Sequence, residues 1–158
     1  MDERYDIAQV CTNGHSANSA FEAFPQFNQD FCDKCGEKTI TTCQSCETPI
    51  RGMYHGGFSL EYDPPAFCYK CGNSFPWTQR KIQAAIELAV EVGGLSGDDA
   101  SQFDASIREI SRDTPQTQVA AHRIKRLLGK FAKSTGNSIR EVMVDIVSET
   151  AKKIIWPD

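Results

Sequence analysis

The pattern of apolar and polar residues changes near residue 78. After this point, apolar residues recur at three- and four-residue steps, the spacing of an amphipathic helix. Before it, they occur in short runs among Phe, Thr, Gly and Pro, and no helical period continues for two turns. The chain is therefore predicted to be an α+β protein with two domains, residues 1–77 built on short strands and residues 78–158 built on helices.

Three to four helices are predicted after residue 78. The pair Gly93-Gly94 ends the first, and Thr114 before a proline opens the third. Ser138 and Glu141 have the spacing of a capping box for the fourth. Helices of this length pack as a small bundle. The predicted helices cover residues 78–92, 98–112, 114–133 and 138–155.

All seven cysteines lie before residue 72, and their spacing is that of metal ligands. Three Cys-x-x-Cys pairs occur, and a fourth pair joins a cysteine to a histidine four residues later. Two residues between thiolates form a tight turn, the zinc knuckle, which aims both sulfurs at one cation, and a second pair completes the tetrahedron. Four pairs therefore predict two sites. The eight predicted ligands are Cys11, His15, Cys32, Cys35, Cys43, Cys46, Cys68 and Cys71.

The pairs can combine in two ways. Pairing in chain order joins the first pair to the second and the third to the fourth, as in tandem zinc ribbons. The alternative is a cross-brace, as in RING-type modules, which joins the first pair to the third. A cross-brace usually places a helix between its inner pairs, and residues 36–42 look instead like one strand between two knuckles. Chain-order pairing is therefore the preferred prediction.

Two structural zinc ions are the expected cofactors. Thiolates, alone or with one imidazole, favour a tetrahedral cation. An iron–sulfur cluster is the alternative at the four-cysteine site. Four protein ligands leave no open position for water or substrate, so neither ion is expected to be catalytic. Glycine follows the second ligand, or precedes the histidine, in three knuckles, but Glu47 takes that place in the Cys43/Cys46 knuckle.

Charge separates the two predicted domains. Residues 1–77 have a net charge of −5, and residues 78–158 have a net charge of +1. Seven thiolates and two zinc ions would take the first domain to about −8, a charge that repels phosphate. No apolar stretch approaches the roughly 20 residues of a membrane span, and the acidic N-terminus lacks the apolar core of a signal peptide. A reducing, cytoplasmic location is therefore expected, and in that setting cysteine pairs are more often metal ligands than disulfides.

The predicted third helix has a basic face. Between residues 114 and 140 there are six basic residues and no acidic one. Most of them lie opposite the apolar stripe of Ile124 and Leu127. This face either binds nucleic acid or another anionic partner, or it is an ordinary solvated surface near acidic groups. Its residues are Arg123, Lys125, Arg126, Lys130 and Lys133.

Two histidines remain outside the predicted sites. His55 is either a ligand or general base, or a strand histidine, and four thiolates already complete the nearest site. An enzyme hypothesis would combine His55 with Glu61 or Asp63. His122 lies on the polar side of the third helix, where an exposed imidazole is expected. The enzyme hypothesis requires the side chains of His55 and Glu61 or Asp63 to meet in one pocket.

Several motifs resemble those of a family of small bacterial zinc-ribbon proteins of unknown function. They are Cys11-Thr-Asn-Gly-His15, Phe31-Cys-Asp-Lys-Cys-Gly36, the inner Cys43/Cys46 pair and Cys68-Tyr-Lys-Cys-Gly72-Asn-Ser-Phe-Pro-Trp77. The resemblance covers about residues 5–77 and continues more loosely through the helices. It implies a bacterial metal-binding protein with these eight ligands, and it supplies no activity.

The sequence predicts a non-enzymatic adaptor. Closed metal sites, an acidic metal domain and the lack of a nucleophile–base pattern favour a protein-binding surface, and the helical domain would dock a partner or self-associate. The alternative is a nucleic-acid-binding regulator that uses the basic third helix. No catalytic residue and no membrane association are predicted.

Overall fold

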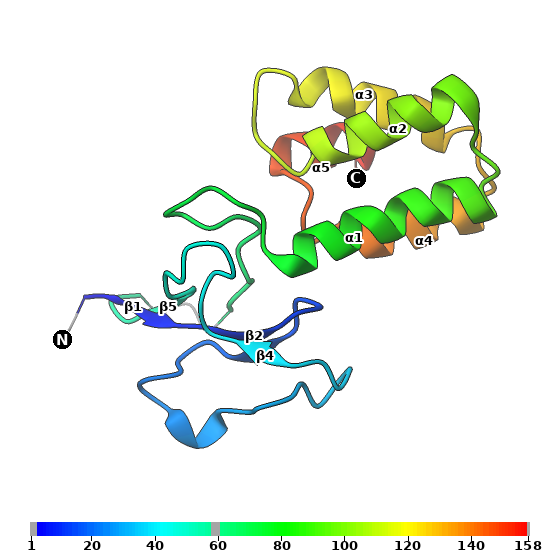
Figure 1. Ribbon diagram of the computed structural model, residues 1–158. Helices are drawn as coiled ribbons and strands as arrows, with labels where there is room; N and C mark the ends of the chain where they lie inside the picture. The colour runs from blue at the N-terminus through cyan, green and yellow to red at the C-terminus, as the bar shows by residue number, and fades with distance from the viewer. Residues whose placement is uncertain (1–2, 58–60, 158) are drawn as a thin grey trace. The chain divides into compact units, whose positions relative to one another are not determined.

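The computed structural model describes residues 3–57 and 61–157 and divides the chain into two compact units, Met1–Gln79 and Arg80–Asp158. The described part of the first unit contains short strands, and that of the second contains helices (Figure 1). Small antiparallel sheets followed by five helices confirm the predicted α+β class. Across the described ranges, no helix is both long enough and apolar enough to cross a membrane.

The strands of the first unit form two small antiparallel sheets. β1 pairs with β5 (Figure 1), and in the other sheet β2 lies between β3 and β4. Each strand is only two to four residues long. A single 3-10 turn, η1 (Pro25–Phe27), lies between β3 and β4. The strands are β1 (Tyr5–Ile7), β2 (Gln9–Cys11), β3 (Ser16–Asn18), β4 (Thr39–Ile40) and β5 (Arg51–Tyr54).

A small core lies beside the metal-ligand clusters of this unit. Trp77 is 1% exposed and stacks on Phe75 with the ring centroids 4.6 Å apart. The Trp77 Nε1–H group donates to the Pro65 carbonyl at 2.9 Å. A Cβ on Gly14 would lie 2.9 Å from Trp77 Cβ, so the backbone of one knuckle contacts this core directly. The other members are Ala8, Val10, Ile50, Cys43 and Cys68.

The second unit is built from helices. α1 begins in the first unit and continues into a π-helical turn, η2, where the Gly93 N–H group donates to the Leu88 carbonyl at 2.9 Å. Gly94 then adopts φ +71°, so the glycine pair ends the first helix. The helices are α1 (Pro76–Glu87), η2 (Leu88–Val92), α2 (Gly97–Glu109), α3 (Thr117–Leu128), α4 (Lys133–Met143) and α5 (Glu149–Ile155).

Two details of the predicted helices are wrong. Residues 138–155 form two helices, and Ser138 lies inside α4, where its hydroxyl donates to the Ser134 carbonyl at 3.1 Å rather than capping a helix. The capping serine is Ser148, whose Oγ accepts from the Ala151 N–H group at 3.3 Å. The Ser148 N–H group also donates to the carbonyl of Ile110, the residue after α2, at 2.9 Å, and so links the start of α5 to α2.

The limits of the third helix also differ from the prediction. Thr114 does not cap α3 directly, because α3 begins only at Thr117. Thr114 lies in a turn ahead of the helix, where its N–H group donates to Thr117 Oγ1 at 2.8 Å and its Oγ1 accepts from the Gln116 N–H group at 3.1 Å. α3 ends at Leu128, and the chain turns at Gly129 before α4 begins at Lys133. The predicted basic face therefore spans two helices instead of one.

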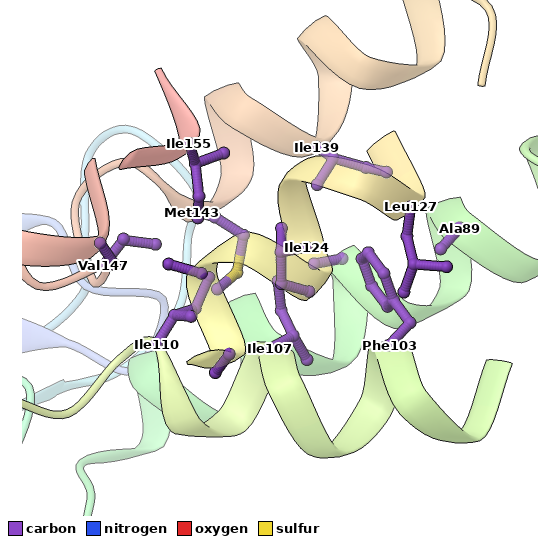
Figure 2. Packing of buried hydrophobic residues seen from close by; sticks show 14 of the residues in the cluster. Ala89, Phe103, Ile107, Ile110, Ile124, Leu127, Ile139, Met143, Val147 and Ile155 are labelled. Carbon is purple, nitrogen blue, oxygen red and sulfur yellow. The ribbon is translucent and has the colours of Figure 1, made fainter. Parts of the chain in front are cut away.

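Buried side chains from every helix meet in one core (Figure 2). Phe103, Ile107 and Ile110 come from α2 and its C-terminal end, and they face Ile124 and Leu127 of α3. Each of these five is at most 1% exposed. Met143 and Ile155 fill the space toward α4 and α5, as Figure 2 shows. Burial of this apolar surface stabilises the second unit without a metal.

Candidate metal centres

The eight predicted ligands gather into two clusters of four in the first unit. Within each cluster, every sulfur or imidazole nitrogen lies within 4.8 Å of the others. The pairs combine in chain order, and the cross-brace alternative is not the observed arrangement. Cluster one is Cys11, His15, Cys32 and Cys35, and cluster two is Cys43, Cys46, Cys68 and Cys71.

Three of the four ligand pairs lie on the same type of turn. In each, the N–H group of the first cysteine donates across the turn at 2.8 Å, and the N–H group two residues later points to the cysteine sulfur at 3.4 Å. An isolated antiparallel bridge flanks each turn. The Cys-x-x-Cys spacing therefore builds its knuckle locally. The bridges are Phe31–Lys38, Thr42–Pro49 and Phe67–Ser74.

The remaining pair, Cys11 and His15, starts at the end of strand β2 and has three residues between its ligands instead of two. The Cys11 N–H group donates to the His15 carbonyl at 2.9 Å, and the His15 N–H group points to Cys11 Sγ at 3.3 Å. Gly14 adopts φ +95°, which favours glycine. The imidazole faces the cluster through Nδ1, which lies 3.4 Å from Cys11 Sγ and 3.5 Å from Cys32 Sγ.

The distances fit one tetrahedral cation in each cluster. Bonds of about 2.3 Å from zinc to sulfur and about 2.0 Å to nitrogen imply sulfur–sulfur edges of about 3.8 Å and sulfur–nitrogen edges of about 3.5 Å. The Cys43–Cys71 and Cys46–Cys68 sulfur pairs are 3.7 Å apart, as is the Cys11–Cys35 pair. A multi-iron cluster would separate the sulfurs more widely, because irons and sulfides lie between them. Both clusters are therefore compatible with a single zinc ion.

Hydrogen bonds lower the pKa of two of the candidate ligand thiols. The Glu37 N–H group and then the Asn13 amide lower the pKa of Cys35 to about 6, and the Asn13 amide lies 3.4 Å from that sulfur. The hydroxyl and N–H group of Thr48 lower the pKa of Cys46 to about 6. Asn13 and Thr48 lie inside the ligand turns but are not ligands, so the search for Cys and His spacing missed them.

Crowding has the opposite effect on Cys71. The Asn73 N–H group lowers its pKa, but burial and the three neighbouring thiols together raise it to about 11. Four thiolates within 4.8 Å of one another repel, so a cation is needed for all of them to ionise. This electrostatic requirement follows from the same close approach of the sulfurs and is consistent with a bound cation.

Glu47 is the one strained residue in the knuckles. Among the described residues, it is the only non-glycine with a positive φ, 62°, and glycines hold the same place in the turns at Gly36 and Gly72. We expect Glu47→Gly to stabilise the zinc-loaded first unit by about 0.5–1 kcal/mol, because it relieves the left-handed strain at some cost in chain entropy. Urea unfolding would measure the change. Gly72→Ala is the control and should destabilise the unit, and a loss of stability in Glu47→Gly would contradict the explanation.

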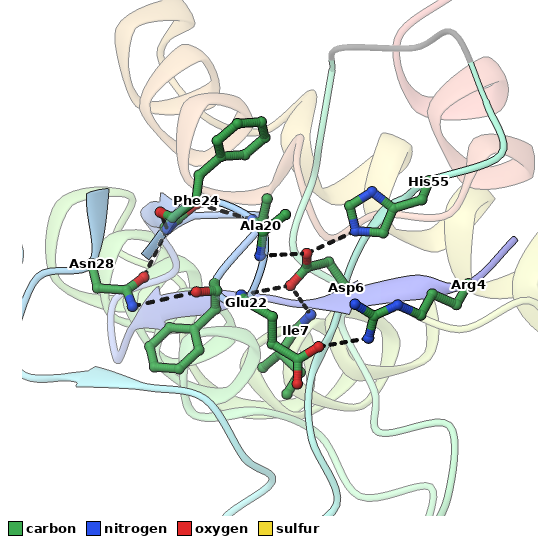
Figure 3. A network of polar contacts seen from close by, with 11 residues as sticks. Arg4, Asp6, Ile7, Ala20, Glu22, Phe24, Asn28 and His55 are labelled. Carbon is green, nitrogen blue, oxygen red and sulfur yellow. Dashed lines mark hydrogen bonds and ion pairs between the residues drawn. The ribbon is translucent and has the colours of Figure 1, made fainter. Parts of the chain in front are cut away.

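His55 belongs to a buried polar network and to neither metal cluster (Figure 3). Its Nε2 atom lies 2.8 Å from Asp6 Oδ2, and the Asp6 side chain is fully buried. Asp6 also accepts from the N–H groups of Ile7 and Glu22 at 2.7 and 2.9 Å. Burial raises the pKa of a carboxyl, but here the hydrogen bonds from Glu22, His55, Ile7 and Ala23 outweigh it and lower the pKa of Asp6. The network joins β1, the turn after β3 and the end of β5.

The residues of the enzyme hypothesis do not meet in one pocket. Glu61 and Asp63 line a hollow of about 460 Å³ together with Tyr5, Tyr54 and Tyr62, and His55 is not among the residues that line it. His122 is exposed on α3, as expected. In the structure, His55 contacts the buried carboxylate of Asp6 instead.

The predicted basic face is divided by the fold. Arg126 donates to Gln102 at 2.8 Å, and Lys130 forms an ion pair with Asp99 at 2.6 Å, so α2 engages two of its members. Lys125 and Lys133 instead line a pocket, and Arg123 is exposed on α3. These five residues do not form one continuous surface on one helix.

Comparison with known proteins gives a family but no activity. No curated protein and no solved structure matches the chain. A family model described as "uncharacterized protein conserved in bacteria (DUF2321)" matches residues 4–155. That range includes both ligand clusters and every helix. The chain therefore belongs to this bacterial family.

Proposed function

We propose that the protein is a non-enzymatic adaptor whose first unit is stabilised by two structural zinc ions. The observation that carries this proposal is the composition of the clusters: each offers four protein ligands around one position. A cation with four protein ligands in a tetrahedron has no site for water or substrate, so the metal would contribute stability and not chemistry. Zinc is the metal that suits three or four thiolates in this geometry.

The first unit also carries an aromatic surface suited to a protein partner. Phe24, Phe27 and Phe31 are 48%, 61% and 64% exposed, and the Phe24 and Phe27 rings lie 6.4 Å apart. Exposed aromatic residues grouped in one segment are typical of protein-binding surfaces. The exposed Asp30 lies in the same segment, as does Glu22, which is ion-paired with Arg4 at 2.6 Å. This surface, called here the Phe surface, suits apolar and basic groups of a partner and disfavours phosphate.

Capture of partners from a nuclease-treated lysate of the native bacterium tests the proposal. The zinc-loaded full chain should retain specific proteins, and the triple variant Phe24→Ser, Phe27→Ser, Phe31→Ser should lose them. Val92→Ser with Val119→Ser is the matched control, because both valines are exposed in the second unit, at 65% and 47%. Native mass spectrometry should find two zinc ions in every variant. Retention from an untreated lysate that is absent from the nuclease-treated lysate would favour the nucleic-acid alternative, and equal retention by the triple variant would contradict the adaptor.

A further inference from the structure

Two adjoining pockets of the second unit form a basic groove where α3 ends and α4 and α5 lie. One has a volume of about 570 Å³ and the other about 260 Å³, and both are lined by Arg140 and Trp156. Arg140 comes from α4, and Trp156 directly follows α5. The groove therefore exists only because the fold brings three helices together.

The charged residues of the groove are almost all basic. Lys125, Lys133, Lys152 and Lys153 join Arg140 in lining it, and among the residues that the structure describes Glu149 is the one acidic lining residue. Glu149 lies 3.1 Å from Lys152 and offsets only one of these charges. The groove thus carries a net positive charge and favours an anionic ligand.

The remaining lining of the groove is largely apolar. Leu128, Phe131 and Ile155 line the smaller pocket, and Val144 lines the larger one. The Arg140 guanidinium lies over the Trp156 ring, 5.6 Å from its centroid. Single-stranded nucleic acid uses exposed ring faces to stack its bases, whereas this tryptophan has a cation over one face and packs against the core. Aliphatic side chains among cations suit a ligand that is itself both apolar and acidic.

We propose that the basic groove binds an acidic amphipathic segment of a partner protein. Apolar side chains of that segment would contact the half-buried Leu128, Phe131 and Trp156, and its carboxylates would pair with Lys133, Arg140 and Lys153. This inference extends the proposed adaptor function, since it assigns a second protein-binding surface to the second unit. It differs from the basic α3 face predicted from sequence, which shares only Lys125 and Lys133 with the groove.

Fluorescence anisotropy with defined probes tests the groove in the zinc-loaded full chain. The probe is a labelled peptide of about 15 residues with leucine at helical spacing and glutamate elsewhere. A scrambled peptide of the same composition and an oligothymidylate of similar length are the comparison ligands. At about 150 mM salt we expect the amphipathic peptide to bind with a Kd below about 1 mM, more tightly than either comparison ligand.

Charge-reversal variants show whether the groove is responsible. Arg140→Glu with Lys153→Glu should weaken peptide binding by about tenfold or more, because two attractions become repulsions. Arg123→Glu with Arg126→Glu is the matched control and should change the Kd by less than about twofold, since neither arginine lines the groove. If the reversed groove lowers the helix content measured by circular dichroism, Arg140→Gln with Lys153→Gln replaces it.

Three results would overturn the inference. These are equal binding of the scrambled peptide, equal losses in the groove and control variants, and tighter binding of the oligonucleotide. The last result would instead make the groove a phosphate-binding surface. Failure of the groove leaves the Phe surface test unchanged, because Phe24, Phe27 and Phe31 lie in the first unit. The adaptor proposal and the groove proposal can therefore fail separately.

Discussion

Removal of both metal ions should unfold the first unit and leave the second unit folded. The first unit has a small apolar core, and two ligand clusters join its otherwise short strands. Binding of a structural zinc ion provides on the order of 10 kcal/mol of folding free energy, more than such a core can replace. The second unit has its own core of buried residues from every helix. Circular dichroism during titration with a chelator should show retained helix, while amide NMR signals of residues 3–57 collapse.

Double cysteine substitutions test which ligand pairs share one metal ion. Cys11→Ser with Cys32→Ser alters one cluster, so native mass spectrometry should show one zinc ion remaining. Cys11→Ser with Cys43→Ser alters both clusters and should remove both ions. Cross-brace pairing would give the reverse result. A full complement of zinc in the second variant, or loss of the helical signal on chelation, would contradict the structure.

Trp77→Ala should destabilise the first unit by about 3–5 kcal/mol, the cost of a cavity left by a large buried aromatic side chain. Trp77 is 1% exposed, stacks on Phe75 and contacts the Gly14 turn between two metal ligands. We therefore expect zinc to be released at lower urea concentration, which a chromophoric chelator would record. The second unit should unfold as in the wild type, because this side chain packs within the first unit.

Trp77→Phe separates the packing of this side chain from its hydrogen bond. Phenylalanine can still stack on Phe75, but it leaves the Pro65 carbonyl without the indole donor 2.9 Å away. The expected loss is about 1–2 kcal/mol, for a hydrogen bond and part of the ring volume. A change below about 1 kcal/mol in Trp77→Ala would show that the metal clusters, and not this core, determine the stability of the unit.

Local features of the chain were predictable from sequence. The spacing of each cysteine pair determines a knuckle of six to eight residues, and all three Cys-x-x-Cys pairs form the same turn. The buried positions of α2, Phe103, Ile107 and Ile110, follow from helical periodicity. The end of the first helix follows from Gly93-Gly94. In each case the deciding interaction joins residues only a few positions apart.

Features that depend on distant residues were not predictable in this way. The capping-box motif at Ser138 was misleading, because Ser138 lies inside α4 and the cap of α5 is Ser148, whose N–H group also donates to the distant Ile110 carbonyl. Asp6 and His55 are 49 residues apart, and no local pattern marks them as partners. The basic groove likewise needs α4 and α5 to be separate helices before Arg140, Lys153 and Trp156 can line it.

The sequence by itself predicted the eight candidate ligands that the structure gathers into two clusters, the division into strands and helices, and the uneven charge of the two parts. Only the tertiary structure decided which ligand pairs combine, how His55 is used and where the basic residues converge. The physical reason is the distance along the sequence between the residues that interact. Knuckles and helical stripes depend on dihedral angles and contacts within one or two turns, whereas pairing and convergence depend on packing between segments that the chain order leaves far apart.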